Sequence, residues 1–266
     1  MKPDLRLGEL AEPNTGARLQ CESDSLVPTH GGRRFPIHAD WIDFLPERDG
    51  EGAQVMTALM HLPAVSSAYE RVVRPSVDGI RVGQRVDWRR EAAWAAEVLC
   101  ETRGVVADLA CGSGFVGIRA AQEAAFEHLY CVDRAEPLLA HCVRRLEVTP
   151  PRCTVTLLRA DTRALPLASR VLDAAHIRIG PSLWRGFDSL VHELARVIKP
   201  GGQLLASAAV GGGDLRGLAA RMIVARTAGI SMPSPARVEM VCETAGFAGV
   251  EVNHDAGVMT LRMSRT

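Results

Sequence analysis

One stretch of the chain combines an acid and several glycines in a pattern that can hold a nucleotide. Asp108 lies near the end of an apolar run, and Gly112, Gly114 and Gly117 follow it. Glycine lets the backbone adopt positive φ and come close to a ligand. A helix that begins directly after such a turn points unpaired N–H groups and the positive end of its dipole at that ligand. The stretch therefore predicts a nucleotide-binding turn between a strand and a helix.

The position of the acids indicates which nucleotide this turn holds. The glycine spacing matches the dinucleotide fingerprint, which is a weak signal by itself. Asp108 precedes the glycines, where its carboxylate would repel a pyrophosphate but could pair with a cationic or amino-acid end of a ligand. A second apolar run begins at Leu129 and ends at Asp133, which is well placed for a ribose diol, as in NAD sites. Asp133 is thus shared with NAD sites, whereas Asp108 disfavours a pyrophosphate at the turn.

Strands and helices alternate around this turn. We expect a helix over 89–101, strands at 155–160, 171–177 and 203–207, and a helix over 189–198 that Lys199–Gly202 closes. A helix and turn over 235–247 then lead to two antiparallel strands, at 250–253 and 258–263. This order describes an α/β domain.

Several of these pieces, taken in order, resemble the class I S-adenosylmethionine-dependent methyltransferases of the type 11 kind. The resemblance covers roughly residues 65 to 266, which is most of the chain, and implies a Rossmann-like seven-stranded sheet. One position departs from the family pattern, because Ala110 stands where the family often has glycine. The matching residues are Asp-Leu-Ala-Cys-Gly-Ser-Gly at 108–114, Asp133, Ala160-Asp161, Leu165-Pro166 and the run from Glu193 to Gly202.

The resemblance implies S-adenosylmethionine as the cofactor and S-adenosylhomocysteine as the product. The turn would approach the methionine part with Asp108 near its ammonium group, and Asp133 would accept both ribose hydroxyls. Arg134 would flank the adenine, and Asp161 would accept from its amino group. The alternative for Asp133 or Asp161 alone is a helix N-cap. The expected cofactor residues are Asp108, Ala110, Cys111, Gly112, Gly114, Asp133, Arg134, Asp161, Thr162 and His176.

The catalytic and acceptor residues have weaker signals. The amide-methylating signature Asn/Asp-Pro-Pro-Tyr is absent after the strand expected at 171–177. His176 lies at the carboxyl end of that strand, where ligands bind in open α/β sheets, and an imidazole there could act as a base on a phenol or enol. A structural role for His176 is the alternative. The candidate acceptor-pocket residues are Tyr69, Arg74, Arg178 and Trp184. For Tyr69 a packing role, and for Arg74 a solvated one, is the alternative.

Residues 1–50 read as a small β module with short strands at 17–21, 30–37 and 41–45. The module resembles the zinc ribbon that precedes the methyltransferase domain in some bacterial ribosomal-RNA guanine methyltransferases and plant plastid methyltransferase-like proteins. Only Cys21 remains of the four zinc-binding cysteines, and His30 and His38 do not complete a four-ligand site, so we expect no metal. Residues 51–104 would form a helical cap or linker, and 105–266 the S-adenosylmethionine-binding domain.

Composition argues against several classes of function. The 266 residues are 47% hydrophobic with a formal net charge of zero, so the basic footprint of a nucleic-acid binder is missing. Neither a membrane span nor a signal segment is evident. Seven cysteines without a CxxC pair indicate reduced thiols in a cytoplasm.

We therefore expect methyl transfer to an oxygen, nitrogen or carbon nucleophile of a small molecule, in bacterial secondary metabolism and natural product biosynthesis. The sequence leaves a homodimer open. Two alternatives remain, an RNA (guanine) methyltransferase and an S-adenosylmethionine-binding protein with a non-methylating activity. An NAD oxidoreductase is more distant, because the Leu-Pro and Pro-Gly-Gly runs do not belong to that pattern.

Overall fold

The computed structural model describes residues 3–45, 65, 68, 88–184, 186–209, 235–255 and 258–266. Its strands are β1 (Leu19–Glu22), β2 (Ser25–Pro28), β3 (Phe35–Pro36), β4 (Trp41–Asp43), β5 (Gly104–Leu109), β6 (Phe126–Asp133), β7 (Thr154–Arg159), β8 (Leu172–Ile179), β9 (Ile198–Ala209), β10 (Phe247–Asp255) and β11 (Val258–Arg265). The main sheet has eight strands in the order β10-β11-β9-β8-β5-β6-β7-β4. All pairs from β9 to β4 are parallel, whereas β11 pairs with β9 and β10 antiparallel.

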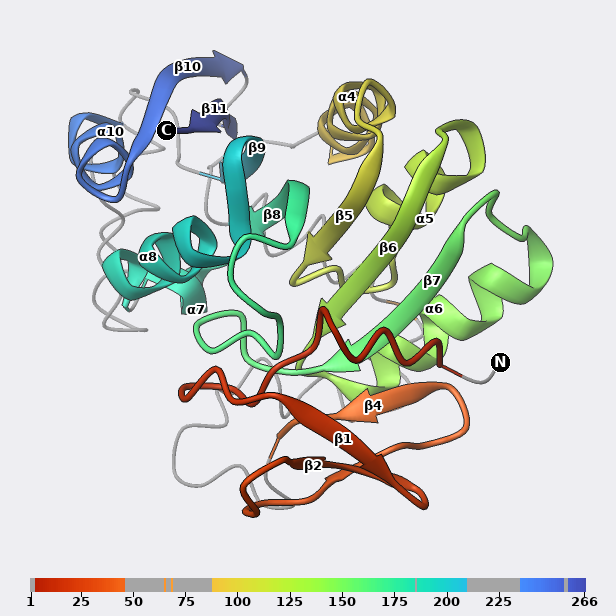
Figure 1. Ribbon diagram of the computed structural model, residues 1–266. Coiled ribbons are helices and arrows are strands. Elements are labelled where there is room, and N and C mark those ends of the chain that lie inside the picture. Colours follow the sequence, from red (N-terminus) through yellow and green to blue (C-terminus); the bar gives the residue numbers. More distant parts are fainter. Residues whose placement is uncertain are drawn as a thin grey trace.

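Helices cover both faces of this sheet (Figure 1). The face under α4 (Trp88–Cys100), α5 (Phe115–Glu123) and α6 (Glu136–Val148) forms one buried apolar cluster. The opposite face packs against α7 (Pro181–Trp184), α8 (Phe187–Val197) and α10 (Pro235–Thr244) in a second cluster. Central strands such as β5 are buried on both faces, which explains why they read as continuous apolar runs. The predicted α/β architecture is confirmed.

The first 45 residues join this sheet at its β7 edge. Strands β1, β2 and β3 form a small antiparallel sheet, and β4 pairs in parallel with β7. The segment before β1 runs along the loop that follows β7, where Ala11 donates its N–H to the Pro166 carbonyl and Ala168 donates to the Glu9 carbonyl. Leu10 and Phe35 belong to the same apolar cluster as the sheet. The amino-terminal strands therefore share a core with the main sheet.

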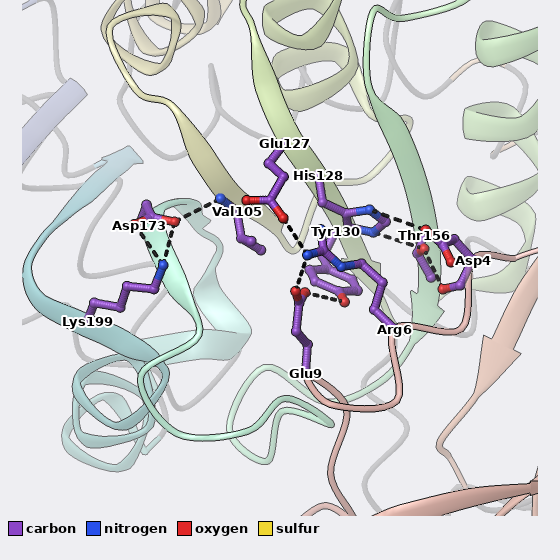
Figure 2. A network of polar contacts seen from close by, with 10 residues as sticks. All are labelled: Asp4, Arg6, Glu9, Val105, Glu127, His128, Tyr130, Thr156, Asp173 and Lys199. Atoms are coloured by element: carbon purple, nitrogen blue, oxygen red, sulfur yellow. Dashed lines mark hydrogen bonds and ion pairs between the residues drawn. The ribbon is translucent and has the colours of Figure 1, made fainter.

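Two details differ from the sequence expectation. The sheet has eight strands rather than seven, because β4 adds to its edge. The run Lys199–Gly202 does not separate a helix from a strand: α8 ends at Val197, and β9 already begins at Ile198. Lys199 is held in place there by Asp173, whose carboxylate accepts bonds from the Lys199 Nζ at 2.8 and 2.9 Å and from the Val105 N–H at 2.8 Å (Figure 2).

Candidate active site

The glycine-rich turn links β5 to α5 at the carboxyl edge of the sheet. Three alternate residues adopt positive φ there: Ala110 at 51°, Gly112 at 59° and Gly114 at 73°. An L-residue in this region costs roughly 1–2 kcal/mol, so Ala110 carries strain that a glycine would avoid. The turn nevertheless has the predicted course, and α5 begins directly after it at Phe115.

Asp133 fixes this turn to the end of the neighbouring strand. Its Oδ2 accepts the N–H of Gly112 at 2.8 Å, and its Oδ1 accepts the N–H of Ala135 at 2.9 Å. Burial raises the pKa of Asp133, although the backbone hydrogen bonds oppose that effect. The backbone N–H of Arg134 is a further hydrogen-bond donor to this carboxylate. An ionised carboxylate has about four acceptor positions, so Asp133 keeps the capacity to accept a hydroxyl group.

Two cysteines pack against the same turn. The Cys142 thiol donates to the Gly112 carbonyl at 3.3 Å, and the Cys111 backbone N–H donates to the Val132 carbonyl at 3.0 Å. The contact with Cys111 and burial raise the pKa of the Cys142 thiol. No local sequence pattern marks the contact of Cys142 with the turn.

The predicted adenine residues form an ion-pair cluster. Both oxygens of Asp161 accept bonds from Arg163, which donates from its backbone N–H and its guanidinium, and Arg134 donates to Oδ2 as well. Burial acts to raise the pKa of Asp161, but the hydrogen bonds and charges of these arginines outweigh it and lower the pKa. Thr162 is buried beside them. Because these bonds use the acceptor positions of Asp161, a bond from an adenine amino group would have to replace one of them.

Asp108 faces a histidine rather than open space. Its Oδ1 lies 2.8 Å from the Nδ1 of His176, and its Oδ2 accepts the N–H of Gly117 at 2.8 Å. Strands β5 and β8 are neighbours, and their register places the Cα atoms of Asp108 and His176 opposite each other. The ammonium contact predicted for Asp108 stays a prediction, and in this structure both carboxylate oxygens have partners inside the protein.

The predicted acceptor residues separate into different layers. Arg178 lies on β8 two residues after His176, and Glu91 of α4 binds it with Nε–Oε1 and Nη2–Oε2 distances of 3.0 and 3.3 Å. Trp184 lies in the apolar cluster on the other face of the sheet, with its ring centroid 5.1 Å from that of Phe187. Arg178 and Trp184 thus lie on opposite faces of the sheet, and their place in one acceptor pocket stays a prediction. Tyr69 and Arg74 lie outside the described residues.

The donor set of this edge fits the nucleoside part of S-adenosylmethionine. Asp133 can accept a ribose hydroxyl, and the turn next to it presents backbone at positive φ. A Cβ at Gly114 would come within 2.5 Å of Ile118 and 3.0 Å of Cys142. The close approach of backbone at this position therefore depends on glycine.

Comparison with known proteins agrees with this geometry. Residues 106–202 match a family model described as a methyltransferase domain. This part of the protein is a class I S-adenosylmethionine-dependent methyltransferase domain. It contains the glycine-rich turn, Asp133 and the Asp108–His176 pair.

Relatives support this assignment over parts of their length. An uncharacterised chloroplastic methyltransferase from Arabidopsis thaliana is 30% identical over 60% of this chain and 46% of its own. A demethylmenaquinone methyltransferase from Thermus thermophilus is 32% identical over 46% of this chain and 54% of its own. The match thus spans about half the length of these relatives.

A solved structure shows the same fold. Phosphoethanolamine N-methyltransferase 2 from Haemonchus contortus, in complex with S-adenosyl-L-methionine, has a TM-score of 0.51 and 20% identity. The alignment covers 62% of this chain and 38% of that one. At this identity the likeness concerns the arrangement of the methyltransferase domain alone.

Two further features concern metals and membranes. In the described part of the chain, no group of three His, Cys, Asp or Glu side chains is arranged to hold a metal ion. Cys21 is exposed in the amino-terminal sheet. None of the described helices has the length and apolar character needed to cross a membrane.

Proposed function

We propose that this protein transfers a methyl group from S-adenosylmethionine to an oxygen, nitrogen or carbon nucleophile of a small molecule. The observation that carries the proposal is the hydrogen bond between Gly112 and Asp133, which joins the glycine-rich turn to the carboxylate that we expect to bind ribose. When bound, the cofactor supplies a methyl group already activated on a sulfonium. The chain then has to hold the acceptor in line with that methyl group and to take up a proton where the acceptor has one to lose.

An aromatic hydroxyl compound is the acceptor class that we favour. The Thermus thermophilus relative is named for demethylmenaquinone, whose reduced form carries ring hydroxyls. The carboxyl edge of this sheet also has a buried imidazole, a group suited to take a proton from such a hydroxyl near neutral pH. A role in secondary metabolism stays a prediction.

The first experiment is a calorimetric titration with S-adenosylmethionine, S-adenosylhomocysteine and NAD, each added to the full chain. We expect micromolar binding of both adenosyl ligands and none of NAD. An acceptor panel of naphthohydroquinones, catechols, enols and amines follows, with methylated product detected by mass spectrometry. Binding of NAD alone, or transfer to RNA but to no member of the panel, would contradict the proposal.

Asp133→Ala tests the ribose contact. Removal of the carboxylate should weaken binding of S-adenosylhomocysteine by about 1.5–3 kcal/mol, the range for hydrogen bonds to charged groups. Asp188→Ala is the matched control, because Asp188 is an exposed acid of α8 that pairs with Arg237. Equal affinities of the two variants and the wild type would contradict the role given to Asp133.

A further inference from the structure

A buried polar pair lies at the carboxyl edge of the sheet, on the face under α4 and α5. Asp108 and His176 are 1% and 3% exposed, and their Oδ1 and Nδ1 atoms are 2.8 Å apart. Asp108 is the last residue but one of β5, whereas His176 lies within β8, three residues before its end. The sheet register places the two residues opposite each other, and a buried carboxylate thereby gains a nitrogen partner.

The start of α5 holds the carboxylate in one orientation. Oδ2 of Asp108 accepts the N–H of Gly117, which lies in the first turn of α5, at 2.8 Å. A Cβ at Gly117 would come within 2.6 Å of the Asp108 Cβ, so the close contact depends on glycine. The positive end of the helix dipole favours a negative charge at this point. Asp108 is thus held with one oxygen directed at α5 and the other at His176.

This orientation determines which nitrogen of His176 carries the proton. An ionised carboxylate only accepts hydrogen bonds, so Nδ1 must be the donor and a neutral imidazole keeps its lone pair on Nε2. Among the described residues, the enclosed side-chain N and O atoms without a partner are Trp41 Nε1, His128 Nδ1, Trp184 Nε1 and Ser207 Oγ. Nε2 of His176 is not one of them, and it has no hydrogen bond to a described residue. It can therefore accept a proton from outside the pair.

The charged groups on the neighbouring elements pair with each other, so Asp108 is the acid that acts on His176. Arg178 is the next residue on the same face of β8, and Glu91 of α4 binds it through two hydrogen bonds. Glu91 therefore offsets the charge of Arg178, while Asp108 is the acid in contact with His176. A positive charge that forms on His176 would be balanced by Asp108 at 2.8 Å.

We propose that His176 is the base of the methyl transfer and that Asp108 is its positioning residue. The nucleophile of the acceptor forms the bond to the methyl carbon, and the electrons of the broken carbon–sulfur bond stay on sulfur. The proton of the nucleophile moves to His176 Nε2, and Asp108 balances the resulting imidazolium. The acceptor must therefore carry an acidic proton, as a phenol, hydroquinone or enol does. This inference rests on the proposed methyl transfer.

The tautomer of His176 tests the pair without any acceptor. We expect two-bond ¹H–¹⁵N spectra of the histidine-labelled full chain to show His176 protonated on Nδ1, with its signals assigned by their loss in His176→Asn. In Asp108→Asn the amide oxygen would accept from Gly117, so its NH₂ group would face His176 and move the proton to Nε2. Protonation of His176 on Nε2 in the wild type would overturn the proposal.

Two variants test the base with the best acceptor of the panel. In His176→Asn the side-chain amide takes the place of Nδ1–H toward Asp108, but nothing replaces Nε2. Asp108→Asn keeps His176 and gives it the other tautomer. Both should lose about 10²–10⁴-fold in kcat, the usual contribution of a general base, and His176→Asn should keep the melting temperature of the wild type.

The outcomes separate the two proposals. Turnover of His176→Asn within threefold of the wild type would overturn the base role. Failure of the wild type to bind S-adenosylhomocysteine would overturn the proposed function instead, and the tautomer experiment would still decide whether Asp108 orients His176.

Discussion

His128 and His176 are two histidines of one sheet, and the protein gives them opposite environments. Both are almost fully buried, at 1% and 3% exposure. His176 faces the carboxylate of Asp108 under α4 and α5, whereas His128 lies on the opposite face, beneath the amino-terminal segment (Figure 2). Burial alone therefore does not decide what a histidine does, because the group that faces each ring nitrogen decides it.

The network around His128 determines the other tautomer. Thr156 donates its hydroxyl proton to the Asp4 carbonyl at 3.1 Å, so the same oxygen must accept from His128 Nε2 at 3.0 Å. The Nδ1 atom is enclosed and has no hydrogen-bond partner among the described residues, and the Asp4 carboxylate lies 4.0 Å from it. Burial lowers the pKa of His128 to about 4, and the charge of Arg6 adds to this effect. His128 is thus held neutral and structural, in contrast to the base role that we propose for His176.

The segment that covers His128 should matter for stability and not for cofactor binding. Leu10 is 2% exposed in the core and pairs with Leu167 across an isolated bridge. Leu10→Ala should lower the free energy of unfolding by about 2–5 kcal/mol, the usual cost of such a cavity, as measured by urea denaturation. S-adenosylhomocysteine affinity should stay unchanged. A parallel loss of affinity would show that the two sides of the sheet act as one unit.

The pH dependence of stability should show whether His128 is held neutral in the folded protein. The pKa of His128 is about 4 in the folded protein against 6.5 for an unperturbed histidine, so the unfolded chain binds the proton more tightly. The contribution of His128 to the free energy of unfolding is complete above pH 6.5 and is lost as the pH falls toward 4. The difference is about 3 kcal/mol. We expect urea unfolding at several pH values to show this slope in the wild type.

His128→Gln is the matched control for that measurement. The glutamine amide can donate to Thr156 as Nε2 does, but it does not titrate. The difference in unfolding free energy between wild type and variant should therefore change by about 3 kcal/mol over this pH window. A constant difference would mean that His128 is not held neutral.

A smaller effect should come from Tyr130, which lies beside His128. Its hydroxyl donates to Glu9 at 2.8 Å, and its ring centroid is 4.5 Å from that of His128. Burial and the bond to Glu9 raise the pKa of Tyr130, so the hydroxyl stays protonated. Tyr130→Phe should lower the unfolding free energy by about 1.5–3 kcal/mol and leave turnover unchanged. Lower turnover with normal stability would contradict the division between the two histidines.

Local sequence patterns determined much of the fold. Apolar runs predicted the parallel strands, because strands buried on both faces have no polar positions to interrupt them. The glycines after β5 predicted the turn, because glycine permits the positive φ that the turn requires. The acid at the end of the next apolar run predicted that Asp133 lies at the same edge, where it binds the turn. The helices expected over 89–101 and 189–198 are confirmed within two residues at each end.

Tertiary structure decided the contacts between strands that are far apart in sequence. Asp108 and His176 are 68 residues apart, and only the adjacency of β5 and β8 makes them partners. The layer of Trp184 and the addition of β4 to the sheet edge likewise depend on which face or edge remains uncovered. The neighbours of a residue in the chain determine its backbone conformation. Its partners across a sheet follow from strand order and register. The sequence alone therefore predicted a cofactor edge, and the fold showed that an acid expected to bind the cofactor faces the candidate base.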